Sequence, residues 1–83
     1  MIGNENRITN NTVTRSSDDS VRIEGDGNVL LSNLTDGNVR LRGNGNTVVN
    51  SIFTKPRARL ILEGSAAHTT TVIGVPEDRI LRV

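Results

Sequence analysis

The chain contains no cysteine, tryptophan or tyrosine, and its 83 residues include a single phenylalanine. Without cysteine, neither a disulfide nor a thiolate metal site can hold the fold together. A compact globular core of this size usually contains more large aromatic side chains. The sequence has instead valine, isoleucine, leucine and threonine at alternate positions, with many asparagines and eight glycines. This composition is typical of short strands joined by sharp bends.

Excess charge and long hydrophobic runs are also lacking. The formal net charge is +1, which implies no general attraction for nucleic acid or for an acidic membrane. No apolar run approaches the roughly 18 residues that a membrane span needs, and the N-terminus lacks the apolar core of a signal peptide. We therefore expect no nucleic-acid partner and no membrane partner. With one histidine and no cysteine, we also expect no metal and no other cofactor.

A unit of about twenty residues recurs along the chain. The most complete copy, Asp26–Gly43, reads DGNVLLSNLTDGNVRLRG, and cutting after each closing glycine gives the units 3–25, 26–43, 44–64 and 65–83. The fourth unit lacks the Gly-Asn opening and the closing glycine. Each unit contains short runs of period two, and no window has convincing helical periodicity. The pattern predicts an all-β chain, folded as one right-handed parallel β-helix domain over 1–83, with four rungs of three short strands.

Stacked rungs place equivalent side chains in columns at the ~4.8 Å spacing of neighbouring strands. The expected inward columns are Ile8, Leu30, Val48 and Thr70, then Val13, Leu34, Phe53 and Val75, and finally Val21/Ile23, Val39/Leu41, Leu60/Leu62 and Leu81/Val83. A polar column contains Asn10, Ser32 and Asn50. Its side chains either form an inward hydrogen-bonded ladder between rungs, which we expect, or lie in exposed turns.

The third strand of each unit carries charges on its outward positions. Glu24, Arg42 and Glu63 share one column with alternating sign, so neighbouring rungs attract each other there. The next outward column consists of Arg22, Arg40, Ile61 and Arg82. Its first two arginines repel each other unless an anionic group lies across them.

The string N-x-I-x-N-N-x-V over Asn6–Val13, followed by V-R-I-E-G, resembles repeats of the pectate-lyase-like superfamily of right-handed parallel β-helix proteins. These include the repeats of periplasmic copper-processing accessory proteins. The resemblance covers nearly the whole chain and implies the fold, together with an extracellular or periplasmic location. The family contains polysaccharide lyases and hydrolases, epimerases, fructotransferases and phage tailspikes. Complete members have many more rungs, so the resemblance implies a segment of a longer helix, at its C-terminal end.

Some titratable residues are candidates for catalysis. Asp18 and Asp19 lie in the first loop and Asp36 lies in the equivalent loop one rung on. Paired carboxylates can act as acid and base, but solvated loop residues explain them equally, and no family motif surrounds them. His68 is the only histidine, and it stands in a turn column that asparagine otherwise fills. We therefore assign no catalytic residue and no metal ligand.

Cationic residues form a candidate ligand site. The set comprises Arg15, Arg22, Arg40, Lys55, Arg57 and Arg59. A groove lined by these side chains can hold a uronate or a sulfated sugar through bidentate contacts. The alternative is a soluble loop whose cations pair with the aspartates named above.

The outward face of the first strands is largely apolar or β-branched. Its columns are Thr9, Leu31, Val49 and Thr71, and Arg7, Val29, Thr47 and Thr69. Contiguous apolar surface marks contact with another chain, whereas the alternative is that single residues such as Leu31 are tolerated in solvent. We predict a homo-oligomer, either through the face made by Val29, Leu31, Thr47 and Val49 or end to end through the uncapped first rung.

Two classes of function remain open. The first is a non-catalytic structural module that self-assembles and displays a carbohydrate-binding face. The second is a fragment or subunit of a β-helix carbohydrate-active enzyme, namely a polysaccharide lyase, epimerase or fructotransferase, or of a phage tailspike. The lack of a catalytic motif favours the first class.

Overall fold

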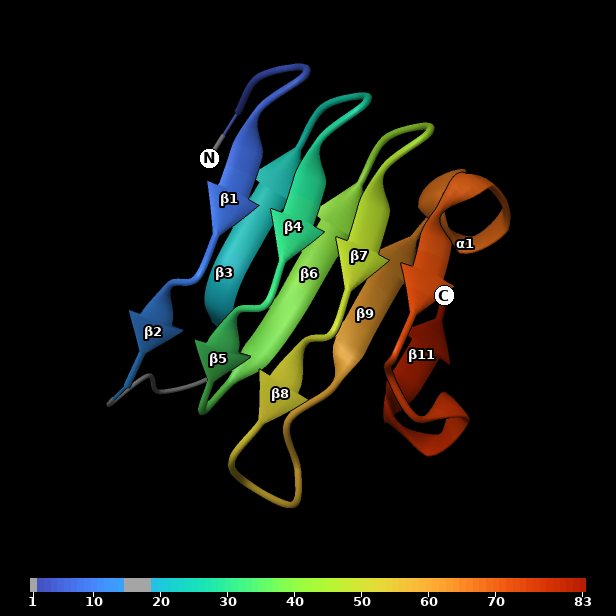
Figure 1. Ribbon diagram of the computed structural model, residues 1–83. Helices are drawn as coiled ribbons and strands as arrows, with labels where there is room; N and C mark the ends of the chain where they lie inside the picture. Colours follow the sequence, from blue (N-terminus) through green and yellow to red (C-terminus); the bar gives the residue numbers. More distant parts are fainter. Residues whose placement is uncertain (1, 15–18) are drawn as a thin grey trace.

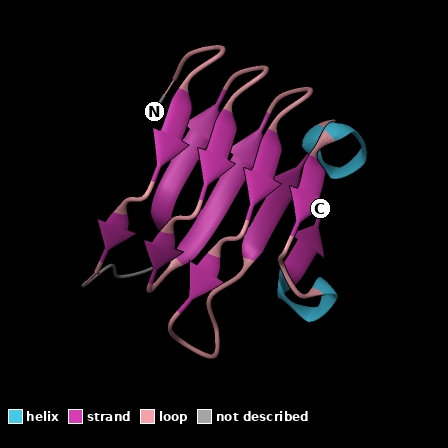
Figure 2. Cartoon of the chain, viewed as in Figure 1, coloured by secondary structure: helices cyan, strands magenta, loops and turns pink. Residues whose placement is uncertain are grey.

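The computed structural model describes residues 2–14 and 19–83, which form a parallel β-solenoid of about four turns (Figures 1 and 2). The first strands of successive rungs are β1 (Arg7–Thr9), β4 (Val29–Leu31), β7 (Thr47–Val49) and β10 (Thr71–Ile73). The second strands are β2 (Thr12–Val13), β5 (Leu34–Thr35) and β8 (Ile52–Phe53). The third strands are β3 (Asp19–Glu24), β6 (Asn38–Arg42), β9 (Leu60–Glu63) and β11 (Ile80–Arg82). The predicted all-β solenoid is confirmed.

The strands pair only with their equivalents in neighbouring rungs. The first sheet has the order β1-β4-β7-β10, the second β2-β5-β8, and the third β11-β9-β6-β3. All of these pairings are parallel. Figure 1 shows the arrows of each sheet lying side by side from the N-terminal to the C-terminal end. Every rung therefore depends on the rungs beside it for its backbone hydrogen bonds.

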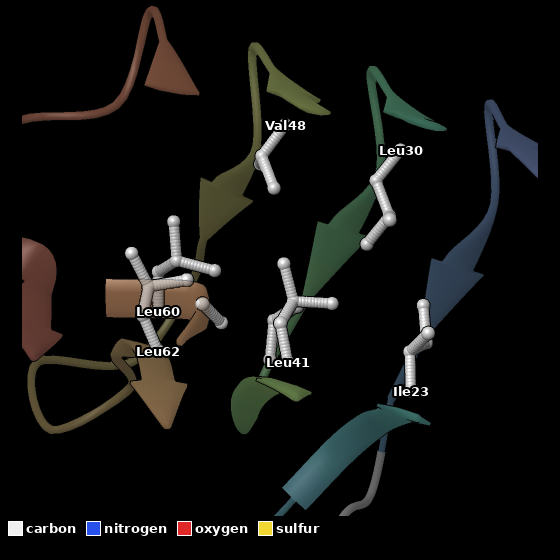
Figure 3. Close-up of a cluster of buried hydrophobic side chains, with 8 residues drawn as sticks. Ile23, Leu30, Leu41, Val48, Leu60 and Leu62 are labelled. Atoms are coloured by element: carbon white, nitrogen blue, oxygen red, sulfur yellow. The ribbon is translucent and has the colours of Figure 1, made fainter. Parts of the chain in front are cut away.

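The core consists of aliphatic columns that run along the solenoid between the sheets. Leu30 pairs with Val48 in the first sheet, and Leu41 pairs with Leu62 in the third. All four side chains are at most 1% exposed, and Figure 3 shows them converging on one interior with Ile23 and Leu60. Burying a side chain of this size stabilises the fold by about 1.5–3 kcal/mol, so stacking the rungs supplies the core that no single rung has.

The fourth rung departs from the predicted register by two residues in the first sheet. Val72, and not Thr70, pairs with Val48. The reason is a single helical turn, α1 (Ala66–Thr69), which takes up the additional residues and buries Ala66 against β9. A turn this short leaves no periodic signal in the sequence, and the fourth unit lacks the Gly-Asn pair that marks the start of the others.

The end of the chain is also shifted, by one residue. A second short helix, η1 (Glu77–Arg79), precedes β11. Ile80 and Arg82 pair with Leu60 and Leu62, so the predicted inward positions of Leu81 and Val83 are wrong. Their side chains are 46% and 60% exposed.

The second strands contain another one-residue error. Thr35, and not Leu34, pairs with Val13 and Phe53, and Thr35 is 1% exposed. Val75, the expected fourth member of this column, belongs to no strand, but it packs against the core as predicted. A strand of two residues is too short for alternation to indicate which residue points inward.

The expected inward ladder of Asn10, Ser32 and Asn50 is wrong, and the turn interpretation holds. All three residues are exposed, and each adopts a φ of 53°. They form left-handed bends between the first and second strands, a conformation that small polar residues tolerate better than branched ones. The bend explains why polar residues recur at this position.

Asparagine ladders do form, at the columns on either side of this bend. The Oδ1 atom of Asn28 accepts hydrogen bonds from the backbone N–H and Nδ2 of Asn6, at 2.9 and 3.1 Å. Its Nδ2 donates to the carbonyl of Gly3 at 3.0 Å, and its N–H donates to Oδ1 of Asn46 at 2.8 Å. Asn33 repeats this pattern, accepting from Asn11 and donating to the carbonyl of Ile8. Buried amides are therefore satisfied between rungs.

Candidate functional site

The outward face of the first sheet is more apolar than the sequence predicts. Its columns are Arg7, Val29, Thr47 and Thr71, and Thr9, Leu31, Val49 and Ile73. The shift introduced by α1 moves Thr71 out of the second column and puts Ile73 in its place. Ile73 is 55% exposed, and it extends the row that Leu31 and Val49 begin. The predicted residues Val29, Leu31, Thr47 and Val49 lie together on this face.

The apolar surface continues around the left-handed bend onto the second sheet. Leu34 and Ile52 pair with each other on β5 and β8, and they point away from the core because Thr35 and Phe53 point into it. Ile52 is 57% exposed. We call the five residues Leu31, Leu34, Val49, Ile52 and Ile73 the apolar strip. Outward positions for Leu34, Ile52 and Ile73 were not predicted from the sequence.

The outward face of the third sheet is charged instead. Glu24, Arg42 and Glu63 pair in register with alternating sign, as predicted. Arg40 lies beside Arg22 in the neighbouring rung. The anionic groups expected across this column are Asp19 and Glu63.

Two N–H donors of the Arg40 guanidinium are engaged by these two carboxylates. Its Nε donates to Asp19 Oδ2 at 3.1 Å and its Nη1 donates to Glu63 Oε2 at 3.2 Å. The hydrogen bond with Asp19, followed by the charges of both carboxylates, raises the pKa of Arg40 above its ordinary value against the opposing effect of burial. These two carboxylates compete with an anionic sugar for Arg40.

The other cations of the candidate glycan site lie on the loop between β8 and β9. Lys55 and Arg57 are exposed, and the Lys55 Nζ atom is 3.8 Å from Asp36 Oδ2. Arg59 donates its Nη1 to the carbonyl of Pro56 at 3.1 Å. Arg15 lies outside the described residues. The loop therefore groups three of the six candidates, whereas Arg22 and Arg40 lie on the third sheet.

The candidate catalytic residues form no acid–base pair in the part of the chain that the structure describes. Asp19 binds Arg40, and Asp36 accepts a hydrogen bond from Ser20 Oγ at 3.2 Å. Asp18 lies outside the described ranges. His68 is exposed on α1. Within residues 2–14 and 19–83 no group of three metal-ligating side chains is close enough to hold a metal, and neither helix has the length and apolar character to cross a membrane.

A small groove lies where the fourth rung lacks a second strand. It has a volume of about 290 Å³. Its lining residues are Ser51, Ile52, Phe53, Gly74, Pro76 and Arg79. Pro76 has no N–H to donate to a sheet, and Arg79 instead donates its Nη1 to the carbonyls of Lys55 and Ala58. The Ser51 hydroxyl is buried and, among the described residues, has no hydrogen-bond partner.

Replacing Ser51 by asparagine is expected to stabilise the fold. Ser51 follows Asn33 in its column, and an asparagine there can accept from the Asn33 N–H and donate to the carbonyl of Leu30, as Asn33 does with Asn11 and Ile8. We expect a gain of about 1 kcal/mol in the free energy of unfolding, measured by urea titration. Ser51→Ala is the control and should be nearly neutral; equal stability of the two variants would contradict the ladder.

The fold and these surfaces place the chain in the class of parallel β-solenoids. Within that class no closer assignment follows, because comparison with family models, with curated proteins and with solved structures finds no match.

Proposed function

We propose that this protein is a non-catalytic structural module that assembles with copies of itself through the apolar strip. The observation that carries the proposal is the uncovered apolar strip on the outward faces of the first and second sheets. Parallel sheets are usually covered on both faces, yet here Ile52 and Ile73 are more than half exposed. A second chain on this face would supply the missing cover.

A copy of the same face is the partner that fits this surface best. Two strips facing each other across a twofold axis match apolar residues with apolar residues, and the flanking threonines add no charge. Arg7 is the one cation of these columns, and it lies on the terminal strand β1, where it stays at the rim. An equivalent contact through the charged third sheet would remove water from Arg40, Asp19 and Glu63, which is costly.

The relationship to the pectate-lyase-like superfamily belongs to the same proposal. It rests on the repeat strings, and the parallel solenoid fold supports it. A glycan ligand would follow from that relationship, with the loop that carries Lys55, Arg57 and Arg59 as the contact. The alternative role as part of an enzyme has less support, because Asp19 and Asp36 are engaged in contacts within the chain.

A matched pair of charge substitutions tests the assembly. Ile73 and Leu81 both lie on the last strand of a sheet, point outward and are 55% and 46% exposed. Ile73→Glu should weaken self-association at least tenfold, about 1.4 kcal/mol, because it places a charge in the strip. Leu81→Glu, on the third sheet, should leave association unchanged.

Sedimentation velocity over a range of protein concentrations measures both variants. A wild-type protein that stays monomeric at the highest concentration, or equal effects of the two substitutions, would contradict the proposal. Far-UV circular dichroism checks that each variant retains its strands.

A further inference from the structure

The second sheet stops at β8, because the fourth rung contributes a strand to the first and third sheets but none to the second. Figure 1 shows a plain trace from β10 to η1, with no arrow beside β8 in that rung. The groove of about 290 Å³ lies here, and its lining combines Ile52 and Phe53 of β8 with Gly74 and Pro76 of the fourth rung. The groove thus occupies the place where the other rungs have a second strand.

Pro76 explains why the strand is missing. Ile73 pairs with Val49, so counting along both rungs makes Pro76 the counterpart of Ile52. Ile52 donates its N–H to the carbonyl of Asn33 at 2.9 Å, which ties β8 to the rung before it. A proline in this place has no N–H to donate, and the chain enters η1 instead. The open edge of β8 is therefore determined by residues inside the fourth rung.

The backbone of β8 presents unpaired groups to this groove. Ile52 and Thr54, on either side of Phe53, each donate an N–H to a carbonyl of the preceding rung at 2.9 Å. Backbone groups alternate in direction along a parallel strand, so the N–H and C=O of Phe53 and the C=O of Ser51 point the other way. Within the described residues β8 pairs only with β5. Such an edge can accept an extended peptide through main-chain hydrogen bonds.

The Ser51 side chain gives a second, independent sign of an unfilled position. Ser51 is 5% exposed, and its hydroxyl has no hydrogen-bond partner among the described residues. One rung earlier in the same column, the Asn11 N–H donates to Oδ1 of Asn33 at 3.0 Å. The fourth rung has Val75 at this count, which supplies no side-chain acceptor. Buried polar groups are normally paired, so an acceptor is missing at this edge.

We propose that the groove binds a short extended segment of another protein, which adds to β8 as a parallel strand. Two N–H groups of the segment donate to the carbonyls of Ser51 and Phe53, and one of its carbonyls accepts from the Phe53 N–H. These are the bonds that β8 itself makes with β5. The volume is at the lower end of the roughly 300–1,000 Å³ of ligand sites, so the groove accommodates two or three residues.

The side chains around the groove define the chemistry of this segment. Its outward residue continues the row of Leu34 and Ile52, so an aliphatic side chain fits there. Arg79 is the one charged residue of the lining, and its guanidinium lies 5.9 Å from the centre of the Phe53 ring. A cationic side chain is therefore disfavoured. The triplet Asn33-Leu34-Thr35, which occupies the equivalent place beside β2, is a model for the ligand.

This site does not rest on the proposed self-assembly, although Ile52 belongs to both surfaces. A second copy on the apolar strip would compete with the peptide at Ile52. Peptide binding is therefore measured at a protein concentration at which sedimentation velocity shows a single species. Binding is observed at the Phe53 amide and assembly is observed by sedimentation, so the failure of either proposal can be recognised separately.

The test titrates the ¹⁵N-labelled wild-type protein with the acetylated and amidated peptide Asn-Leu-Thr-Gly. In the proposed register the glycine N–H donates to the Phe53 carbonyl, as the Thr54 N–H donates to the carbonyl of Thr35. The matched control is the same peptide with N-methylglycine in place of glycine, which lacks that N–H. We expect the Phe53 amide signal to shift and its hydrogen exchange to slow about tenfold at saturation.

The N-methylated peptide should bind about tenfold more weakly, because one hydrogen bond to the edge is lost. Equal affinities of the two peptides, shifts that leave the Phe53 amide unchanged, or no binding of the parent peptide would each overturn the proposal. Because the protein carries no substitution, its folding does not affect the outcome.

Discussion

Replacing Gly43 by alanine is expected to destabilise the solenoid by more than about 3 kcal/mol, one of the largest losses available to a single methyl group. Gly43 has a φ of +130°, in a region that side chains rarely adopt. A Cβ atom there would collide with the carbonyl oxygen of Gly25, the equivalent glycine of the preceding rung. The strained backbone accounts for about 1–3 kcal/mol, and forcing the two rungs apart adds the loss of hydrogen bonds and core contacts.

Gly45 provides the control within the same turn. Its φ is +65°, but a Cβ atom there would have nothing within 4 Å. Gly45→Ala should therefore lose only the left-handed backbone penalty of about 1–2 kcal/mol. Urea unfolding followed by circular dichroism measures both variants. Equal losses would mean that backbone conformation alone, and not the close approach of the rungs, requires glycine at position 43.

The repeat made the fold predictable because a solenoid converts sequence periodicity into long-range contacts. Residues 18 to 22 positions apart, such as Asn28 with Asn46 or Ile8 with Leu30, lie in neighbouring strands or turns. The period therefore indicates which residues, distant in the sequence, are in contact. The sequence of a globular fold without repeats contains no such signal. The alternating column of Glu24, Arg42 and Glu63 was correct for the same reason.

The errors lie where local conformation breaks the period. The left-handed bend at Asn10 and its equivalents shifts the alternation of inward and outward side chains by one residue. As a result, Thr35 points inward and Leu34 points outward. Because the bend was not predicted, the polar column of Asn10, Ser32 and Asn50 was assigned to the core. Asn28 and Asn33, which do form the ladders, were not assigned to it. The Gly-Asn pair of the second and third units was the signal for the first ladder, whereas in the first unit the ladder residue Asn6 follows Glu5.

The candidate surfaces were predictable only in part. The face formed by Leu31 and Val49 followed from alternation in three-residue strands, but its extension to Ile73 depends on the single helical turn of α1. The pairing of Arg82 with Leu62 likewise depends on η1, which shifts the last strand by one residue. Elements of three or four residues are set by packing against the preceding rung and leave little trace in the sequence.

Replacing Asn28 by aspartate is expected to destabilise the fold by at least about 3 kcal/mol at neutral pH. Asn28 is completely buried, and its Nδ2 donates to the carbonyl of Gly3 at 3.0 Å. A carboxylate oxygen in that place would face the carbonyl with no proton between them. The two donors of Asn6 still serve the other oxygen, so the penalty comes from the lost donor and the buried charge.

This penalty should shrink in acid, because the protonated carboxyl can donate to the Gly3 carbonyl. Burial and that carbonyl both raise the pKa of the new carboxyl in the folded state above its unfolded value of about 3.9. Folding then binds the proton more tightly, so the variant is least destabilised below the unfolded pKa and loses stability as the pH rises through the folded pKa. Urea unfolding at about pH 4 and pH 7, with Asn50→Asp in the exposed bend as the control, measures the difference. If the two variants respond alike to pH, the buried amide of Asn28 is not what joins the rungs.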